Sequence, residues 1–200
     1  MQQAKRKSTF YKLAVLSAVF LAAPAPADSP SYNFLEAGYQ SVNLDLGGGL
    51  EFDGEGYGLR GSFEIGDNMF GFASYVDTGF DFNVDTTQLQ VGLGWRTGLT
   101  DNTDFFVLAA YVDVEADAQG AGSVDQSGYV VGIGVRSNVT DLIELYGEID
   151  YVDLGSGSDS TAVYGGIWFN FSDSFAFGLN VGVDDDLTSY GASARLNFGK

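Results

Sequence analysis

From Tyr32 onward, the sequence alternates apolar and polar residues with a period of two and shows no helical period. The pattern is clearest in Gln88–Arg96, QLQVGLGWR, where every second residue from Leu89 to Trp95 is apolar. Successive side chains of a β-strand point to opposite faces, so such a segment has one apolar and one polar face. The pattern predicts an all-β fold.

Ten segments of this kind are separated by turn residues. They are Tyr32–Leu44, Gly56–Glu64, Met69–Asp77, Gln88–Arg96, Phe105–Val114, Gly128–Arg136, Ile143–Asp153, Ala162–Phe171, Phe175–Asp184 and Ser189–Phe198. A tilted strand of about 9 to 11 residues crosses a bilayer. Four apolar-rich segments, 32–44, 69–77, 105–114 and 162–171, fit either register. We expect ten strands, with eight as the alternative if the last two hairpins are shorter or shifted.

The connections alternate between two kinds. Short turns fall at 66–67, 100–103, 138–140 and 172–173. Acidic, mostly longer and Gly-rich connections fall at 45–53, 77–85, 115–125 and 153–159, with a tight one at 184–186. Transmembrane barrels have short periplasmic turns and longer outer loops, so the rhythm favours antiparallel hairpins that cross a membrane.

The composition of the two faces separates a membrane barrel from a soluble sheet. The polar face carries Gly, Ser, Gln and Arg but no Lys, whereas soluble sheets usually protect their edges with Lys. Aromatic residues lie near the strand ends of the apolar face, as an interfacial girdle requires: Tyr57, Phe63, Trp95, Tyr151, Phe175, Tyr190 and Phe198. We therefore predict a closed, antiparallel up-and-down transmembrane β-barrel over residues 28–200.

The first 27 residues have the pattern of an export signal. A basic start is followed by an apolar run from Leu13 to Ala23 and by the small residues Ala25-Pro26-Ala27. We expect cleavage near Ala27 and delivery to the bacterial outer membrane. The remaining chain keeps 27 acidic and 5 basic residues, and so strong an excess of acid excludes nucleic-acid binding.

The last predicted strand carries a family resemblance. Tyr190, Ala192, Ala194, Leu196 and Phe198 alternate up to a near-terminal Phe, which resembles the C-terminal signature read by the barrel assembly machinery. Residues 31–198 as a whole resemble the small outer-membrane barrels of the OmpA-like and opacity-type group. Three sequence segments are most similar to short-looped barrels once described as secreted sensing factors: SYNFLEAGY, GYGLRGSF and TDFFVLAAYVDVEAD. The resemblance implies a fold and a location, and little about activity.

All four arginines after residue 27 lie on the predicted inner face, towards the strand ends that lead into short turns or into the C-terminus. Inward acids are available beside them, and we expect one lumen charge cluster of Arg60, Arg96, Arg136, Arg195, Glu36, Glu64, Glu144 and Glu148. A buried guanidinium has to be paired. We favour an ion-pair plug that closes the lumen of a structural or surface-interaction protein. The alternative is that the cluster forms the constriction of a narrow porin-like channel for small solutes. Inward glycines at 56, 58, 92, 94, 132 and 134 would leave open space above the arginines.

The sequence contains no His and no Cys, so the usual general bases and nucleophiles are missing. We predict no enzyme, no catalytic residue, no cofactor and no dedicated metal site. The acidic loops, densest at Asp184–Asp186, are either simply solvated or share Ca²⁺ or Mg²⁺ with lipopolysaccharide phosphates. Outer-membrane lipid is the expected partner, and the oligomeric state is left open.

Overall fold

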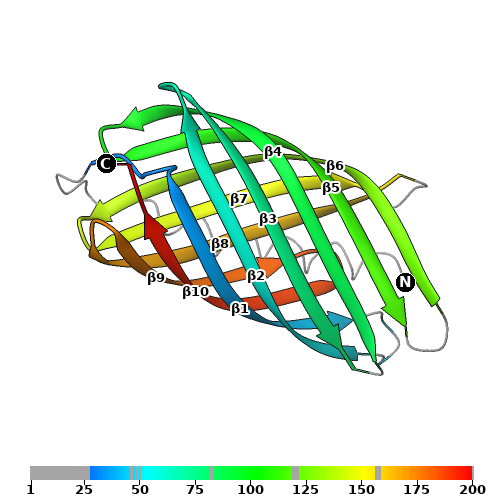
Figure 1. The fold of residues 1–200 in the computed structure, drawn as a ribbon. Coiled ribbons are helices and arrows are strands. Elements are labelled where there is room, and N and C mark those ends of the chain that lie inside the picture. The colour runs from blue at the N-terminus through cyan, green and yellow to red at the C-terminus, as the bar shows by residue number, and fades with distance from the viewer. Residues whose placement is uncertain are drawn as a thin grey trace, which may run out of the picture.

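The computed structural model describes residues 28–45, 47, 49, 51–81, 83–118, 122–155 and 159–199. These residues form one closed antiparallel barrel of ten strands, in which each strand pairs with its neighbours in sequence and the last with the first (Figure 1). The strands are β1 (Phe34–Asp45), β2 (Glu51–Ile65), β3 (Met69–Phe80), β4 (Val84–Thr100), β5 (Thr103–Ala118), β6 (Gly122–Thr140), β7 (Ile143–Asp153), β8 (Asp159–Ser172), β9 (Phe175–Val183) and β10 (Leu187–Asn197). The ten-strand barrel prediction is confirmed. In the described residues, no helix is long and apolar enough to span a membrane.

The predicted faces of the regular strands are confirmed. On β4, Leu89 and Leu93 are exposed on the outside, while Gly94 is buried. The four segments whose register was open put large apolar side chains into the lumen: Phe34, Phe70, Phe72, Phe106, Leu108 and Trp168 are all buried. The interior is therefore more aromatic than the regular strands suggested.

The outward aromatic residues separate into two belts. Near the end with turns 66–68, 101–102, 141–142 and 173–174, called the turn end, the belt is Phe and Trp, as at Phe63 and Trp95. Towards the opposite end, called the loop end, it is mainly Tyr. There the triplet Tyr-Val-Asp recurs at 75–77, 111–113 and 151–153, and the Tyr111 hydroxyl donates a hydrogen bond of 3.1 Å to Asp113. A tyrosine ring suits the membrane interface, and the carboxylate two residues later needs water. The Tyr-Val-Asp triplets therefore mark the boundary between the lipid and the outer solvent.

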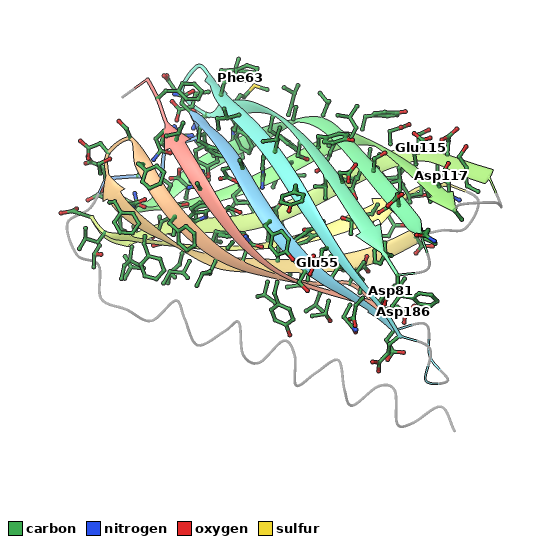
Figure 2. All side chains as sticks on the ribbon, turned by 60° about the horizontal axis from the view of Figure 1, so that its bottom comes forward. Glu55, Phe63, Asp81, Glu115, Asp117 and Asp186 are labelled. Carbon is green, nitrogen blue, oxygen red and sulfur yellow. The ribbon has the colours of Figure 1, made fainter. Side chains whose placement is uncertain are left out.

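The connections at the loop end are shorter than the sequence suggested. The strands leave only 46–50, 81–83, 119–121, 154–158 and 184–186 between them. Most of the predicted loops 77–85 and 115–125 is strand, as are residues 45 and 51–53 of the predicted loop 45–53, so that part of the prediction was wrong. The ladder continues beyond the tyrosines into a part of the barrel where Glu115 and Asp117 are exposed. Figure 2 shows Asp81, Glu115, Asp117 and Asp186 at the end of the barrel opposite Phe63.

Several inward glycines accommodate aromatic rings from the neighbouring strand. A methyl group added at Gly94 would overlap the ring of Phe70, and one added at Gly134 would overlap the ring of Phe106. Gly92 is covered in the same way by Phe72. The expectation of open space was therefore wrong at these three positions, because each missing side chain makes room for a phenylalanine.

We predict that Gly94→Ala lowers the free energy of unfolding by about 1–3 kcal/mol, because the buried Phe70 ring would have to move. The matched control is Gly58→Ala, where the nearest atom to the new methyl lies at 3.5 Å, an ordinary contact. The control should be neutral or stabilising by about 0.5–1 kcal/mol. Urea unfolding of the protein in detergent micelles measures both, and equal midpoints for the two variants would contradict the packing argument.

Candidate functional site

The turn half of the lumen holds a stack of alternating guanidinium groups and aromatic rings. The carbon atom Cζ of Arg136 lies 4.6 Å from the centroid of the Tyr32 ring and 5.5 Å from that of Phe34. Arg96 covers Tyr32 at 4.8 Å. On the far side Arg195 lies 4.6 Å from Phe34 and 3.8 Å from Trp168. We call Arg96, Tyr32, Arg136, Phe34, Arg195 and Trp168 the cation–aromatic stack.

Carboxylates bind the edges of these guanidinium groups. Arg136 contacts the Oε1 atom of Glu144 through Nε at 2.8 Å and through Nη2 at 2.7 Å. Arg195 binds the same carboxylate through Nη1 at 3.1 Å and Glu36 through Nε at 2.6 Å. Glu144 therefore bridges two arginines, and all three side chains are at least nine-tenths buried.

Arg96 has two carboxylate partners, of which Glu64 belongs to the predicted cluster. Its Nη2 atom lies 3.0 Å from Glu64, and its Nη1 atom lies 2.9 Å from Asp104. Asp104 is almost fully buried and was not among the predicted residues. Asp104 is the second residue of β5, a strand whose register could not be predicted from the sequence.

Arg60 and Glu148 lie further from the turn end than the stack. Within the described residues, no carboxylate lies within ion-pairing distance of Arg60, whose guanidinium lies 5.6 Å from the Phe72 ring centroid. Glu36 is its register partner on β1, and Glu148 interacts with it electrostatically. The eight predicted residues thus divide into a compact paired group and a looser pair, Arg60 and Glu148.

Residues 28–33, called the N-terminal segment, enter the barrel at the turn end. The Nη1 atom of Arg136 donates to the carbonyl oxygen of Ser31 at 2.9 Å, and the side-chain amide of Asn138 donates to that of Asp28 at 2.6 Å. Pro30 and Tyr32 are buried. The segment is therefore attached to the inner wall by several polar contacts and by the ring that it inserts into the stack.

Sequence reasoning missed this segment, because it placed Tyr32 in the first strand and did not use it as an inward side chain. It also missed Asp104 and Asp150, although both are acids in inward positions of apolar strands. One signal could have found them. Each is an acid in an apolar-rich strand, and it lies on the side that faces the lumen together with the polar face of the next strand.

Three cavities follow one another along the lumen formed by the described residues. The largest, about 370 Å³, lies towards the loop end, and Glu148, Asp150 and Gln88 are among its lining residues. A second of about 70 Å³ lies among the aromatic rings and arginines of the stack. The third, of about 120 Å³, lies at the turn end, next to Asp28 and Glu144.

This geometry agrees with the comparison to known protein families. The family model described as "Outer membrane protein beta-barrel domain" matches residues 13–184. The chain belongs to the outer-membrane β-barrel family. Its location is accordingly the bacterial outer membrane. Because barrels of this kind have short periplasmic turns, we expect the turn end to face the periplasm. No functionally curated protein matches the sequence.

Solved outer-membrane barrels share the fold at low sequence identity. An outer membrane channel from Pseudomonas putida F1 is similar with a TM-score of 0.56 and 9% identity, covering 88% of this chain and 99% of that one. KdgM porin in complex with disordered oligogalacturonate is similar with a TM-score of 0.51 and 9% identity, covering 83% and 99%. At this identity the likeness shows the barrel fold alone.

We predict that Arg136→Ala lowers the free energy of unfolding of this outer-membrane barrel by about 3–5 kcal/mol. The change removes the ion pair with Glu144, the donor to Ser31 and one cation from the Tyr32 ring. Glu115→Gln, at the exposed loop end, is the control and should shift stability by no more than about 0.5 kcal/mol. A midpoint for Arg136→Ala equal to that of the control in urea unfolding would show that the cluster does not brace the lumen.

Proposed function

We propose that this protein is a closed outer-membrane barrel with a structural or surface-interaction role, blocked at its periplasmic end by the cation–aromatic stack and the N-terminal segment. The observation that carries the proposal is the narrowing of the lumen towards the turn end, where the cavities measure about 70 and 120 Å³, against about 370 Å³ near the loop end. The residues between them, such as Tyr32 and Arg136, are 2% and 6% exposed. Ion pairs and stacked rings of this kind fill a narrow barrel with its own side chains.

The expected cleavage near Ala27 is part of this proposal. A mature chain that starts at Asp28 would have its first residues inside the periplasmic mouth, where Asn138 and Arg136 bind the backbone. The export signal itself, residues 1–27, lies outside the described residues. Removal of the signal would then leave the N-terminal segment, residues 28–33, as a plug that is covalently continuous with β1.

A narrow channel is the second candidate function, and the outer cavity favours it. Gln40, Gln88 and Gln90 give this cavity a polar wall, and its floor contains Arg60. If the N-terminal segment left the mouth, the same arginines would line a constriction that selects small solutes.

Planar-bilayer recording separates the two candidates. We expect the mature protein, with its start at Asp28 verified by mass, to show no discrete conductance. A variant that starts at Phe34 should conduct, because it lacks Tyr32 and the backbone that Arg136 and Asn138 bind. Discrete steps from the complete mature protein, altered in size by Arg96→Ala or Arg136→Ala, would establish the channel instead.

We further propose that the acidic loop end meets lipopolysaccharide through shared divalent cations. The arginines of the described barrel all point inward, so the loop end presents carboxylates such as Asp117 and Asp186 to an anionic lipid surface. Repulsion between the two would be relieved by Ca²⁺ or Mg²⁺, which prefer carboxylate and phosphate oxygens. In the described residues, no group of three or more potential metal ligands is gathered by the protein alone, so lipid phosphates would complete the coordination.

Hydrogen exchange in lipopolysaccharide-containing bilayers tests this surface proposal. Addition of a chelator should speed amide exchange at the loop ends of β5 and β6, because the shared cations that hold them against the lipid are removed. The periplasmic ends of the same strands are the internal control. Unchanged exchange at the loop ends after chelation would contradict the proposal.

A further inference from the structure

The outer cavity has a wall whose charges are unbalanced. Its charged lining residues are Glu36, Arg60, Glu148 and Asp150. Glu36 is bound by Arg195 in the stack below. Arg60 is then the one cation left in the described cavity lining to face two carboxyl groups, Glu148 and Asp150.

Glu148 and Asp150 both point into this cavity from β7. They are 7% and 8% exposed, and their carboxyl groups are within hydrogen-bonding reach of each other. The Oδ1 atom of Asp150 is buried and has no hydrogen-bond partner. A buried acid in this state costs free energy unless a proton or a cation satisfies it.

The opposite strand makes room for the Asp150 carboxyl group. Asp150 pairs in register with Gly132 on β6, and a methyl group at Gly132 would overlap its Oδ1 atom. Glu148 likewise pairs with Gly134. The Asp150 carboxyl group therefore occupies space that a larger residue at position 132 would fill, whereas the space at Gly134 is taken by the Phe106 ring.

Two tyrosines lie beside Glu148: Tyr146 is two residues before it on β7, and Tyr164 is directly across from it on β8. The Tyr146 ring lies over Gly166, and the Tyr164 ring lies over Gly182. Tyr164 is the register partner of Glu148 on β8. Both tyrosines line the cavity. An aromatic ring that lines a cavity can attract a cation to its negative face.

The wall of the cavity has accessible side chains towards the loop end. Tyr164 is 37% exposed and Gln88 is exposed, although both side chains point inward. Acidic residues of the loop end, such as Glu115 and Asp117, raise the local concentration of cations there. A volume of about 370 Å³ is of the size that small-molecule sites have.

We propose that the outer cavity binds a small solute carrying an ammonium group, with the ammonium held by Asp150 and Glu148 against the rings of Tyr146 and Tyr164. Hydroxyl and amide side chains of the remaining wall, such as Ser193 and Asn180, face the rest of the solute. Asp150 and Tyr164 line the outer cavity alone, whereas Tyr146 and Glu148 also line the cavity among the stack residues, so the site borders the stack.

An organic ammonium fits the site better than a divalent metal ion. Ca²⁺ takes six to eight oxygen ligands at short distances. Glu148 and Asp150 are two acids, and in the described part of the chain no group of three or more potential ligands is placed for a metal. Aromatic faces contribute nothing to the coordination of a hard cation, whereas they stabilise an ammonium group directly.

Ligand-observed NMR with n-butylammonium as the probe tests the proposal on the mature protein in detergent micelles at neutral pH. We expect binding by the wild type, and 1-butanol, the neutral probe of the same shape, should bind more weakly. Asp150→Asn should weaken n-butylammonium binding by about tenfold or more, because the ammonium loses a desolvated partner. Asp117→Asn removes the same charge from the exposed loop end and should change binding by no more than about twofold.

Gly132→Ala is the second test variant, because it keeps both carboxyl groups and displaces that of Asp150. It should weaken binding while heat-modifiable gel migration shows a folded barrel. Three results would overturn the proposal: equal binding by the wild type and Asp150→Asn, equal binding of 1-butanol, or displacement of n-butylammonium by Ca²⁺ that depends on Asp150. The last result would identify a metal site.

Discussion

Lipid offers no hydrogen bond to a peptide group, so the ladder between the first and last strands is the contact on which the rest of this structure depends. β1 pairs with β10 from Phe34 opposite Asn197 to Leu44 opposite Leu187. The same register puts Glu36 between Arg195 on one side and Arg60 on the other. The ion pair between Glu36 and Arg195 therefore joins residues from the two ends of the chain, and it forms only when the barrel closes.

Closure fixes the width of the lumen, and the two halves of the barrel fill that width differently. In the half towards the turn end, rings such as Phe70 and Phe106 project across glycines of the neighbouring strands. In the outer half the inward residues include Gly58, Ser74 and Gln90, which are too small or too polar to meet across the centre. Both halves have the same ten strands and therefore the same width. One half is filled and the other hollow because only the large aromatic side chains reach across the lumen.

The sequence predicted the strands best where the two faces differ most. The bounds of Ile143–Asp153 agree with β7, and the faces of Gln88–Arg96 are as predicted. The strands 69–77 and 105–114 showed no clear period because they carry apolar residues on both faces, one set towards lipid and one towards the stack. The register of β3 could nevertheless have been found by comparing neighbouring strands. The two phenylalanines of its Phe-x-Phe, 70 and 72, pair with the two glycines of the Gly-x-Gly of β4, 94 and 92.

The N-terminal segment could not be predicted by periodicity, because residues 28–33 form no strand and their partners lie far away in sequence. Ser31 accepts its hydrogen bond from Arg136, and the Tyr32 ring is held between guanidinium groups of β4 and β6. A guanidinium has five donors at its edge and two apolar faces, so carboxylates and aromatic rings can satisfy it at the same time. An ammonium has no such faces. This difference gives a physical reason why the cations inside the barrel are all arginines, and why Tyr32 and Phe34 had to be aromatic to complete the stack.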